Sequence, residues 1–270
     1  MTIEQALTDF KTLIDQAILD DGAAGKMAMI RSAKPIMRLH EAVKSQLISN
    51  GTDAELIFPP LGKRQPEIKL AGARKQKNQD VCVVPSLGKA EEIFLEGFLE
   101  STVDEYGELF TEQTLAINVR SQISSVQKNF DTLYERTISE AENLHGRCPK
   151  MCLGEVYLLA VLEYDDRAEK NREIAFKKAN PKTVEKYIRA FQAINKRKTT
   201  DRYFYQYEKV CLLLVDFSQN LVKLYHTDYE LRQAGLLPEQ SQVSMAELSW
   251  NRFIPDLLAV HNQRFGLLNH

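Results

Sequence analysis

Two long apolar runs constrain the fold of this chain more than any other feature. Residues 153–164 read LGEVYLLAVLEY, and residues 210–217 read VCLLLVDF. Strands that are covered on both faces have nearly continuous apolar sequences, because neither face meets water. Apolar residues at helical spacing between these runs predict helices at 166–178 and 181–197. The sequence therefore predicts an α/β protein whose sheet lies between layers of helices.

The remainder of the chain supplies more elements of both kinds. Short apolar stretches flanked by turn residues predict further strands at 67–71, 81–84 and 115–119. Apolar residues at helical spacing predict helices at 2–20, 27–49, 89–106, 127–145 and 245–262. Between the first strands, residues 72–79 form a basic linker that fits a hairpin loop. Helices that precede, interleave with and follow the strands predict one domain with a mixed sheet.

Composition narrows the classes of function. The net charge of −2 argues against a protein that coats nucleic acid indiscriminately, which would be strongly basic. Charge is unevenly spread: residues 63–77 are rich in Lys and Arg, whereas residues 91–112 contain acids and no base. No apolar run reaches the roughly 18 residues of a membrane span, so no membrane association is expected. Four cysteines make no disulfide framework in a chain of this size, and we expect a reducing, cytoplasmic setting.

Three segments place acids and a base where they could meet. The segment KNQDVCVV puts Asp80 at the start of a strand. The segment LAINVRSQ puts Asn118 and Arg120 on one face of another strand, because side chains alternate with period two. In the helix that follows, Glu140 lies at the edge of the apolar stripe and should point toward the sheet. Two acids and a cation suit phosphodiester hydrolysis, in which carboxylates hold Mg²⁺ and a cation offsets developing charge.

These segments resemble the PD-(D/E)xK restriction endonucleases over residues 66–165. They are similar to the variant that cleaves CCGG-like sites, in which the second metal-binding acid has moved from the strand to the following helix; NVRSQ followed by SEAENL carries the likeness. The resemblance implies a restriction-endonuclease-like mixed β-sheet and a type II enzyme that cleaves double-stranded DNA at specific sites with Mg²⁺. Asp80 and Glu140 would bind the metal, Arg120 would support the attacking water, and Asn118 would line the site.

The resemblance also implies an organisation for the whole chain. Residues 1–50 would be N-terminal helices, 60–165 the catalytic core and 166–270 helical and strand additions to the same domain. Such an enzyme would act as a homodimer, because each site cuts one strand and a palindrome has two-fold symmetry. The basic residues Arg74, Lys75 and Lys77, with Lys69, would hold the DNA backbone. A solvated surface loop is the alternative for this basic stretch.

Departures from the family pattern leave alternatives open. Asn118 stands where an acid is usual, and Arg120 stands where lysine is usual; Lys128 or Lys69 could supply the ammonium group instead. Glu135, or Glu67 in its Glu-x-Lys spacing with Lys69, competes with Glu140 as the second metal-binding acid. The alternative function is a catalytically inactive DNA-binding module or a subunit of a defence or repair complex. A third hypothesis is an interaction protein that does not bind nucleic acid.

Overall fold

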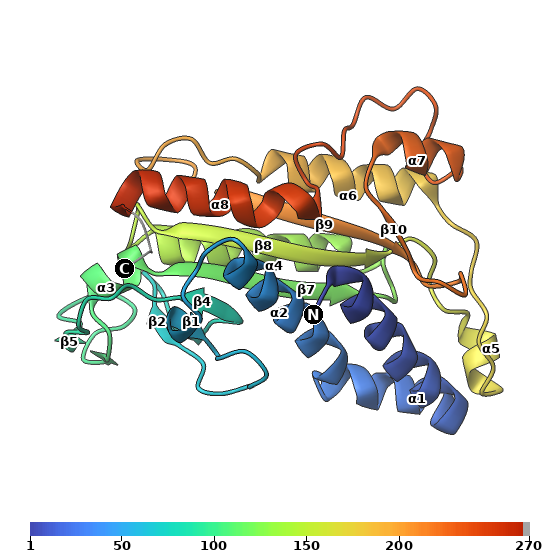
Figure 1. Cartoon of the computed structure of the whole chain (residues 1–270), viewed down its shortest axis with the longest axis horizontal. Coiled ribbons are helices and arrows are strands. Elements are labelled where there is room, and N and C mark those ends of the chain that lie inside the picture. The colour runs from blue at the N-terminus through green and yellow to red at the C-terminus, as the bar shows by residue number, and fades with distance from the viewer. Residues whose placement is uncertain (267–270) are drawn as a thin grey trace.

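A six-stranded mixed sheet lies between two layers of helices (Figure 1) in a computed structural model that describes residues 1–266. In order across the sheet, the strands are β1 (Ile57–Phe58), β4 (Val81–Val83), β7 (Leu115–Gln122), β8 (Cys152–Ala160), β9 (Lys209–Asp216) and β10 (Lys223–Tyr225). The three central strands β7, β8 and β9 are parallel, and the outer pairs are antiparallel. The predicted α/β class, with a mixed sheet flanked by helices, is confirmed.

The two apolar runs form neighbouring central strands. Every residue of β8 and β9 is buried, as expected for strands covered on both faces. Parallel neighbours require a crossover, and α4 (Phe130–His145) joins β7 to β8. Between β8 and β9 lie α5 (Asp166–Lys170) and α6 (Pro181–Ala193); Asn180 caps α6, and Pro181 occupies its first turn. The segment after residue 166 therefore supplies two strands of the same sheet.

The helices divide between the two faces. One face is covered by α1 (Ile3–Arg31), α2 (Lys34–Ser49) and α8 (Trp250–Phe265), against which Val156 and Leu158 of β8 pack. The other face is covered by α4, α6 and α7 (Asp228–Gln233), against which Tyr157 and Leu159 pack. Alternation along each strand thus builds two apolar cores, one on each side of the sheet. No helix in the described residues is both long enough and apolar enough to cross a membrane.

The N-terminal helices differ from their predicted bounds. Asp21 and Gly22 do not end the first helix; they kink α1, with Gly22 at φ 59°. The break comes instead at Ser32 and Ala33, where Ala33 adopts a φ of 60° and α2 begins with Pro35 in its first turn. Likewise, the helix predicted at 166–178 ends at Lys170, and the chain then extends to form a bridge between Tyr164 and Phe176.

Residues 89–106 do not form the predicted helix. They contain a hairpin of β5 (Glu92–Ile93) and β6 (Val103–Asp104), followed by α3 (Glu108–Gln113). A helix would stack Glu92, Glu96, Glu100 and Asp104 at four-residue spacing, where like charges repel. The hairpin instead lets Arg147 pair with Glu92 at 2.9 Å and with Asp104 at 2.5 Å.

A short strand leaves one edge of the sheet open. β4 pairs with residues 115–117 of β7, so the second half of β7 projects beyond it. The basic linker forms a separate hairpin of β2 (Lys69–Ala71) and β3 (Gln76–Asn78) just before β4, and a short 3₁₀ turn, η1 (Ala54–Leu56), precedes β1. The hairpin, the projecting end of β7 and α4 lie together, and this is where the residues singled out in the sequence meet.

Candidate functional site

Asp80 closes the end of β4 against β7. The antiparallel register pairs Val81 with Ile117, which places Asp80 opposite Asn118. One carboxylate oxygen of Asp80, Oδ2, accepts a hydrogen bond from the backbone N–H of Val119 at 2.8 Å. The side chain thereby continues the pairing of β7 past the end of β4, and this bond fixes Asp80 at the open edge of the sheet.

A cleft of about 370 Å³ opens at this edge. Asp80 and Arg120 line it from the sheet, and Arg136 lines it from α4. The opposite wall is the junction of α1 and α2, which contributes Ile30 and Ala33. The cleft therefore lies between the N-terminal helices on one side and α4 on the other.

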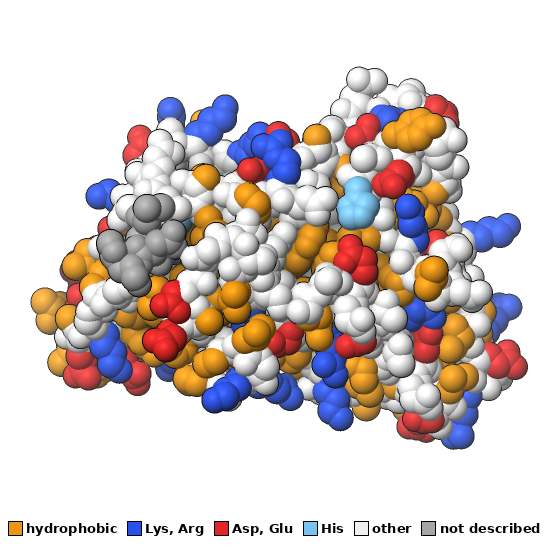
Figure 2. Space-filling view, viewed as in Figure 1, with side chains coloured by type: hydrophobic (Ala, Val, Ile, Leu, Met, Phe, Trp, Pro, Cys, Tyr) orange, Lys and Arg blue, Asp and Glu red, His pale blue; other side chains and the backbone are white. Residues whose placement is uncertain are grey.

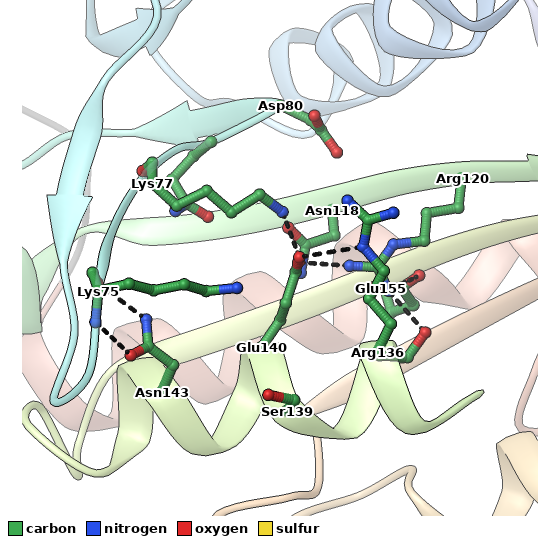
Figure 3. A network of polar contacts seen from close by, with 12 residues as sticks. Lys75, Lys77, Asp80, Asn118, Arg120, Arg136, Ser139, Glu140, Asn143 and Glu155 are labelled. Carbon is green, nitrogen blue, oxygen red and sulfur yellow. Dashed lines mark hydrogen bonds and ion pairs between the residues drawn. The ribbon is translucent and has the colours of Figure 1, made fainter. Parts of the chain in front are cut away.

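Arg120 connects two carboxylates from different elements (Figure 3). Its guanidinium group donates to Glu155 Oε1 at 3.1 Å and to Thr137 Oγ1 at 2.6 Å, and it forms an ion pair with Glu140. Burial alone would lower the pKa of Arg120, but Glu155 and the other acidic groups raise it above its usual value. Arg120 is therefore a permanent positive charge at the centre of the cluster.

Glu140 points from α4 toward the sheet, as its place beside the apolar stripe predicts. Its side chain is only 4% exposed and is paired with both Arg120 and Lys77, while Arg136 Nε lies 3.9 Å from its Oε1. Burial would raise the pKa of Glu140, but Arg120 and Lys77 lower it below its ordinary value. Glu140 is thus held ionised next to the cleft.

Glu155 is the member of the cluster that sequence reasoning missed. It lies on β8 directly opposite Asn118, and its side chain is fully buried. One oxygen accepts from Arg120, but Oε2 has no hydrogen-bond partner within residues 1–266. Burial, partly offset by Arg120 and reinforced by Glu140 and Asp80, raises the pKa of Glu155 to about 8. The sequence signal was a single acid within the otherwise apolar strand LGEVYLLA. The apolar pattern predicts a buried strand and assigns no role to that acid.

Asn118 lies beneath this cluster. It is 3% exposed, and its amide Nδ2 donates to the hydroxyl group of Tyr207 at 3.4 Å. The Tyr207 hydroxyl in turn donates to the backbone oxygen of Thr137 at 2.8 Å. Asn118 shares the strand face of Arg120, as predicted, but it contacts the buried side of the cluster.

The basic hairpin is fastened to α4. Asn143 accepts hydrogen bonds from the backbone N–H groups of Arg74 at 2.8 Å and Lys75 at 3.1 Å, and its backbone oxygen accepts from Ala73 at 2.7 Å. Gly72 allows this close approach, because a Cβ atom there would lie 2.3 Å from Asn143. Figure 3 shows Lys75 and Lys77 reaching from the hairpin toward Glu140. The hairpin is therefore a fixed wall of the site.

The other sequence candidates lie outside the cluster. Lys128, just before α4, and Glu135, on α4, are exposed. Lys69 is exposed on the hairpin, and Glu67 accepts a hydrogen bond from Asn78 at 2.6 Å. Among the acids singled out in the sequence, Glu140 is the one that pairs with Arg120, and Lys77 is the lysine that pairs with Glu140.

The donor set suits magnesium in its chemistry, because carboxylate oxygens are the ligands that Mg²⁺ prefers. Glu155 Oε2, buried and without a partner, is an oxygen available for a further contact. Within residues 1–266, however, no three His, Cys, Asp or Glu side chains are grouped as a metal-ion site. Both oxygens of Glu140 are engaged by cations, and in the view of Figure 3 the Lys77 ammonium group lies between Glu140 and Asp80.

Comparison with family models, with curated proteins and with solved structures found no match to this chain.

Proposed function

We propose that this chain hydrolyses phosphodiester bonds of double-stranded DNA with Mg²⁺, as a site-specific endonuclease of the type II restriction kind. One observation carries the proposal: Asp80 and Arg120, which are far apart in the sequence, line a single cleft, and Glu140 is paired with Arg120. They come from a strand end, the adjacent strand and the following helix, which is the order that the resemblance to PD-(D/E)xK enzymes implies. A homodimer in the cytoplasm, with one site for each DNA strand, belongs to the same proposal.

The chain's own residues supply binding and charge compensation. Asp80 and Glu140 are the carboxylates that would hold the ion once Lys77 is displaced from Glu140, and the ion would polarise a phosphate and lower the pKa of a bound water. Arg120 offsets the negative charge that develops on the phosphate, as a fixed cation in a partly buried site. Burial raises the pKa of Glu155 to about 8, so this carboxyl group ionises less readily than an ordinary one. Lys77 keeps Glu140 ionised before substrate arrives.

Asp80→Asn tests the proposal directly. We expect the wild-type protein to cut a long mixed-sequence duplex into discrete fragments with magnesium, and Asp80→Asn to lose at least roughly 100-fold in rate, because the amide cannot bind the ion as a carboxylate does. Asp201→Asn, at an exposed position, is the matched control and should cut normally. Fragment sizing gives the rates, and thermal melting checks that both variants fold. Full cutting by Asp80→Asn would overturn the proposed site.

A catalytically inactive DNA-binding module is the second candidate, and a specific feature favours it. Asn118 and Arg120 replace the acid and lysine of the family pattern, and both oxygens of Glu140 are already neutralised by cations. Binding of duplex DNA in EDTA, together with no cleavage in magnesium or manganese, would select this function. An interaction protein of another kind would neither bind nor cleave DNA.

A further inference from the structure

The junction of α1 and α2 and the loop after β1 carry exposed cations. Residues 22–40 contain four Lys or Arg residues and no acid, and residues 56–66 contain two and no acid. Within these segments Lys26 pairs with Glu169, and Arg38 lies 4.0 Å from Asp9. The remaining four are exposed, and the described residues give them no ion pair. We name this set the N-terminal basic wall: Arg31, Lys34, Lys63 and Arg64.

Arg31 and Lys34 lie in the segment whose apolar residues line the cleft beside Asp80; the four cations themselves are not among the lining residues. Ile30, Ala33 and Ile36, which alternate with Arg31 and Lys34 along the chain, line the cleft. Arg64 Nη2 donates to the backbone oxygen of Ser32 at 3.4 Å, which brings the loop after β1 onto the junction of α1 and α2. Figure 2 shows Lys and Arg side chains along the lower edge of the molecule, where Figure 1 places this junction and this loop.

The cations on the two sides of the cleft differ in whether carboxylates pair with them. On the α4 side, Lys77 and Arg136 approach Glu140, and Arg74 pairs with Glu142 at 3.4 Å. The four cations of the N-terminal basic wall form no ion pair within the described residues, although Glu41 of α2 lies at the same loop, where it pairs with Lys44 and accepts from the Gly62 N–H at 2.7 Å. A polyanion that entered the cleft would supply the missing counter-charge.

We propose that the N-terminal basic wall binds backbone phosphates of duplex DNA beside the phosphate that is cut. The inference rests on the proposed function and adds a second binding surface to the hairpin. Contacts of this kind fix the position of the duplex without reading its sequence, and they make the affinity fall steeply with salt. The duplex then lies between the hairpin and α4 on one side and the α1–α2 junction on the other.

Charge removal at this wall tests the inference in the absence of cutting. The triple variant Arg31→Gln, Lys34→Gln and Arg64→Gln is compared with Arg167→Gln, Lys170→Gln and Arg172→Gln, which removes three exposed charges at and just after α5. Fluorescence anisotropy of a labelled duplex in EDTA, between about 50 and 200 mM salt, gives affinity and salt slope. The Arg31→Gln, Lys34→Gln double variant keeps the Arg64–Ser32 contact and serves if the triple variant fails to fold.

We expect the wall variant to bind at least about tenfold more weakly at low salt and to lose about two to three units of salt slope, while the α5 variant keeps wild-type values. Wild-type affinity and slope in the wall variant, or equal losses in the α5 variant, overturn the inference. If the wild-type protein cuts DNA and the wall variant still binds normally, the wall alone is rejected. If the wild-type protein does not bind DNA at all, the wall and the proposed function are rejected together.

Discussion

Two buried glutamates, Glu155 on β8 and Glu208 just before β9, illustrate opposite uses of a buried charge. Glu208 immediately precedes β9, and its oxygens accept from the Leu153 N–H at 2.8 Å and from Arg264 at 2.9 Å, with Arg197 and His145 each at 3.3 Å. Burial would raise the pKa of Glu208, but His145 and Arg264 lower it below its usual value. Both oxygens of the Glu208 carboxylate therefore have partners, and they connect the start of β8 and the start of β9 to the neighbouring loops.

Glu155 has fewer partners in a comparably buried setting. Arg120 reaches one of its oxygens, Oε2 has no partner, and its pKa rises to about 8. Buried polar groups are nearly always paired, so an unpaired one beside a cleft is a candidate for function. The contrast teaches that two equally buried carboxylates can differ in the completeness of their partner sets, and that this difference, rather than burial, marks Glu155 as unusual.

The largest expected difference between the two glutamates is in stability. Glu208→Ala should lower the free energy of unfolding by about 3–5 kcal/mol, because it leaves the guanidinium groups of Arg197 and Arg264 buried without their carboxylate. Glu155→Ala should cost clearly less, since Arg120 retains Glu140. Urea unfolding of both variants measures the two values. Equal losses would show that the two clusters have the same structural role.

The pH dependence of stability sharpens the comparison. Glu155 has a pKa of about 8 in the fold, against an ordinary value of 4.5, so between these values the folded protein holds a proton that the unfolded chain releases. The contribution of Glu155 to stability is therefore present in full below about pH 4.5 and is lost as pH rises toward 8. Glu155→Gln removes this loss, so the variant should gain stability relative to wild type as pH rises.

Urea unfolding of wild type and Glu155→Gln across this pH range measures the effect. Glu135→Gln, at an exposed position of α4, is the control and should run parallel to wild type. Parallel curves for Glu155→Gln would mean that Glu155 is ionised in the folded protein throughout the range.

The smallest expected effect on stability concerns Tyr207, which lies between the Glu155 and Glu208 clusters. Tyr207 precedes Glu208 in the chain, yet its hydroxyl group belongs to the Asn118 side, where it donates to the backbone oxygen of Thr137. Tyr207→Phe should lower the free energy of unfolding by about 0.5–1.5 kcal/mol, the usual worth of one such hydrogen bond. A loss as large as that of Glu208→Ala would show that the two clusters are coupled through this residue.

Local periodicity explains which parts of the site were predictable. Alternation along β7 placed Asn118 and Arg120 on one face, and helical spacing turned Glu140 toward the sheet; both are properties of a single element. The partnership of Arg120 with Glu155 depends on the register between β7 and β8, which no local pattern contains. The ion pairs that occupy Glu140 likewise depend on the hairpin packing against α4.

The fold shows the same difference between local patterns, which the sequence displays, and contacts between distant segments, which it does not. The strands at β8 and β9 were predicted because their apolar runs are long and continuous. The helix predicted at 89–106 was wrong. The prediction followed the spacing of apolar residues and neglected the repulsion between acids four residues apart. Arg147, which pairs with two of those acids in the hairpin, lies about 40 residues or more away in the sequence, so no local pattern includes it. The break between α1 and α2 was misplaced because Gly22 is accommodated as a kink, whereas Ala33 adopts the left-handed conformation.

The attachment of the basic hairpin to α4 by Asn143 has a mechanical consequence. Lys77 and Glu140 are carried by two elements that Asn143 joins, so their relative placement is preorganised and requires no ordering when a ligand arrives. Any widening of the cleft must then come from the N-terminal helices, whose junction forms the other wall. A ligand larger than the cleft would therefore have to move the α1–α2 junction away from the hairpin and α4.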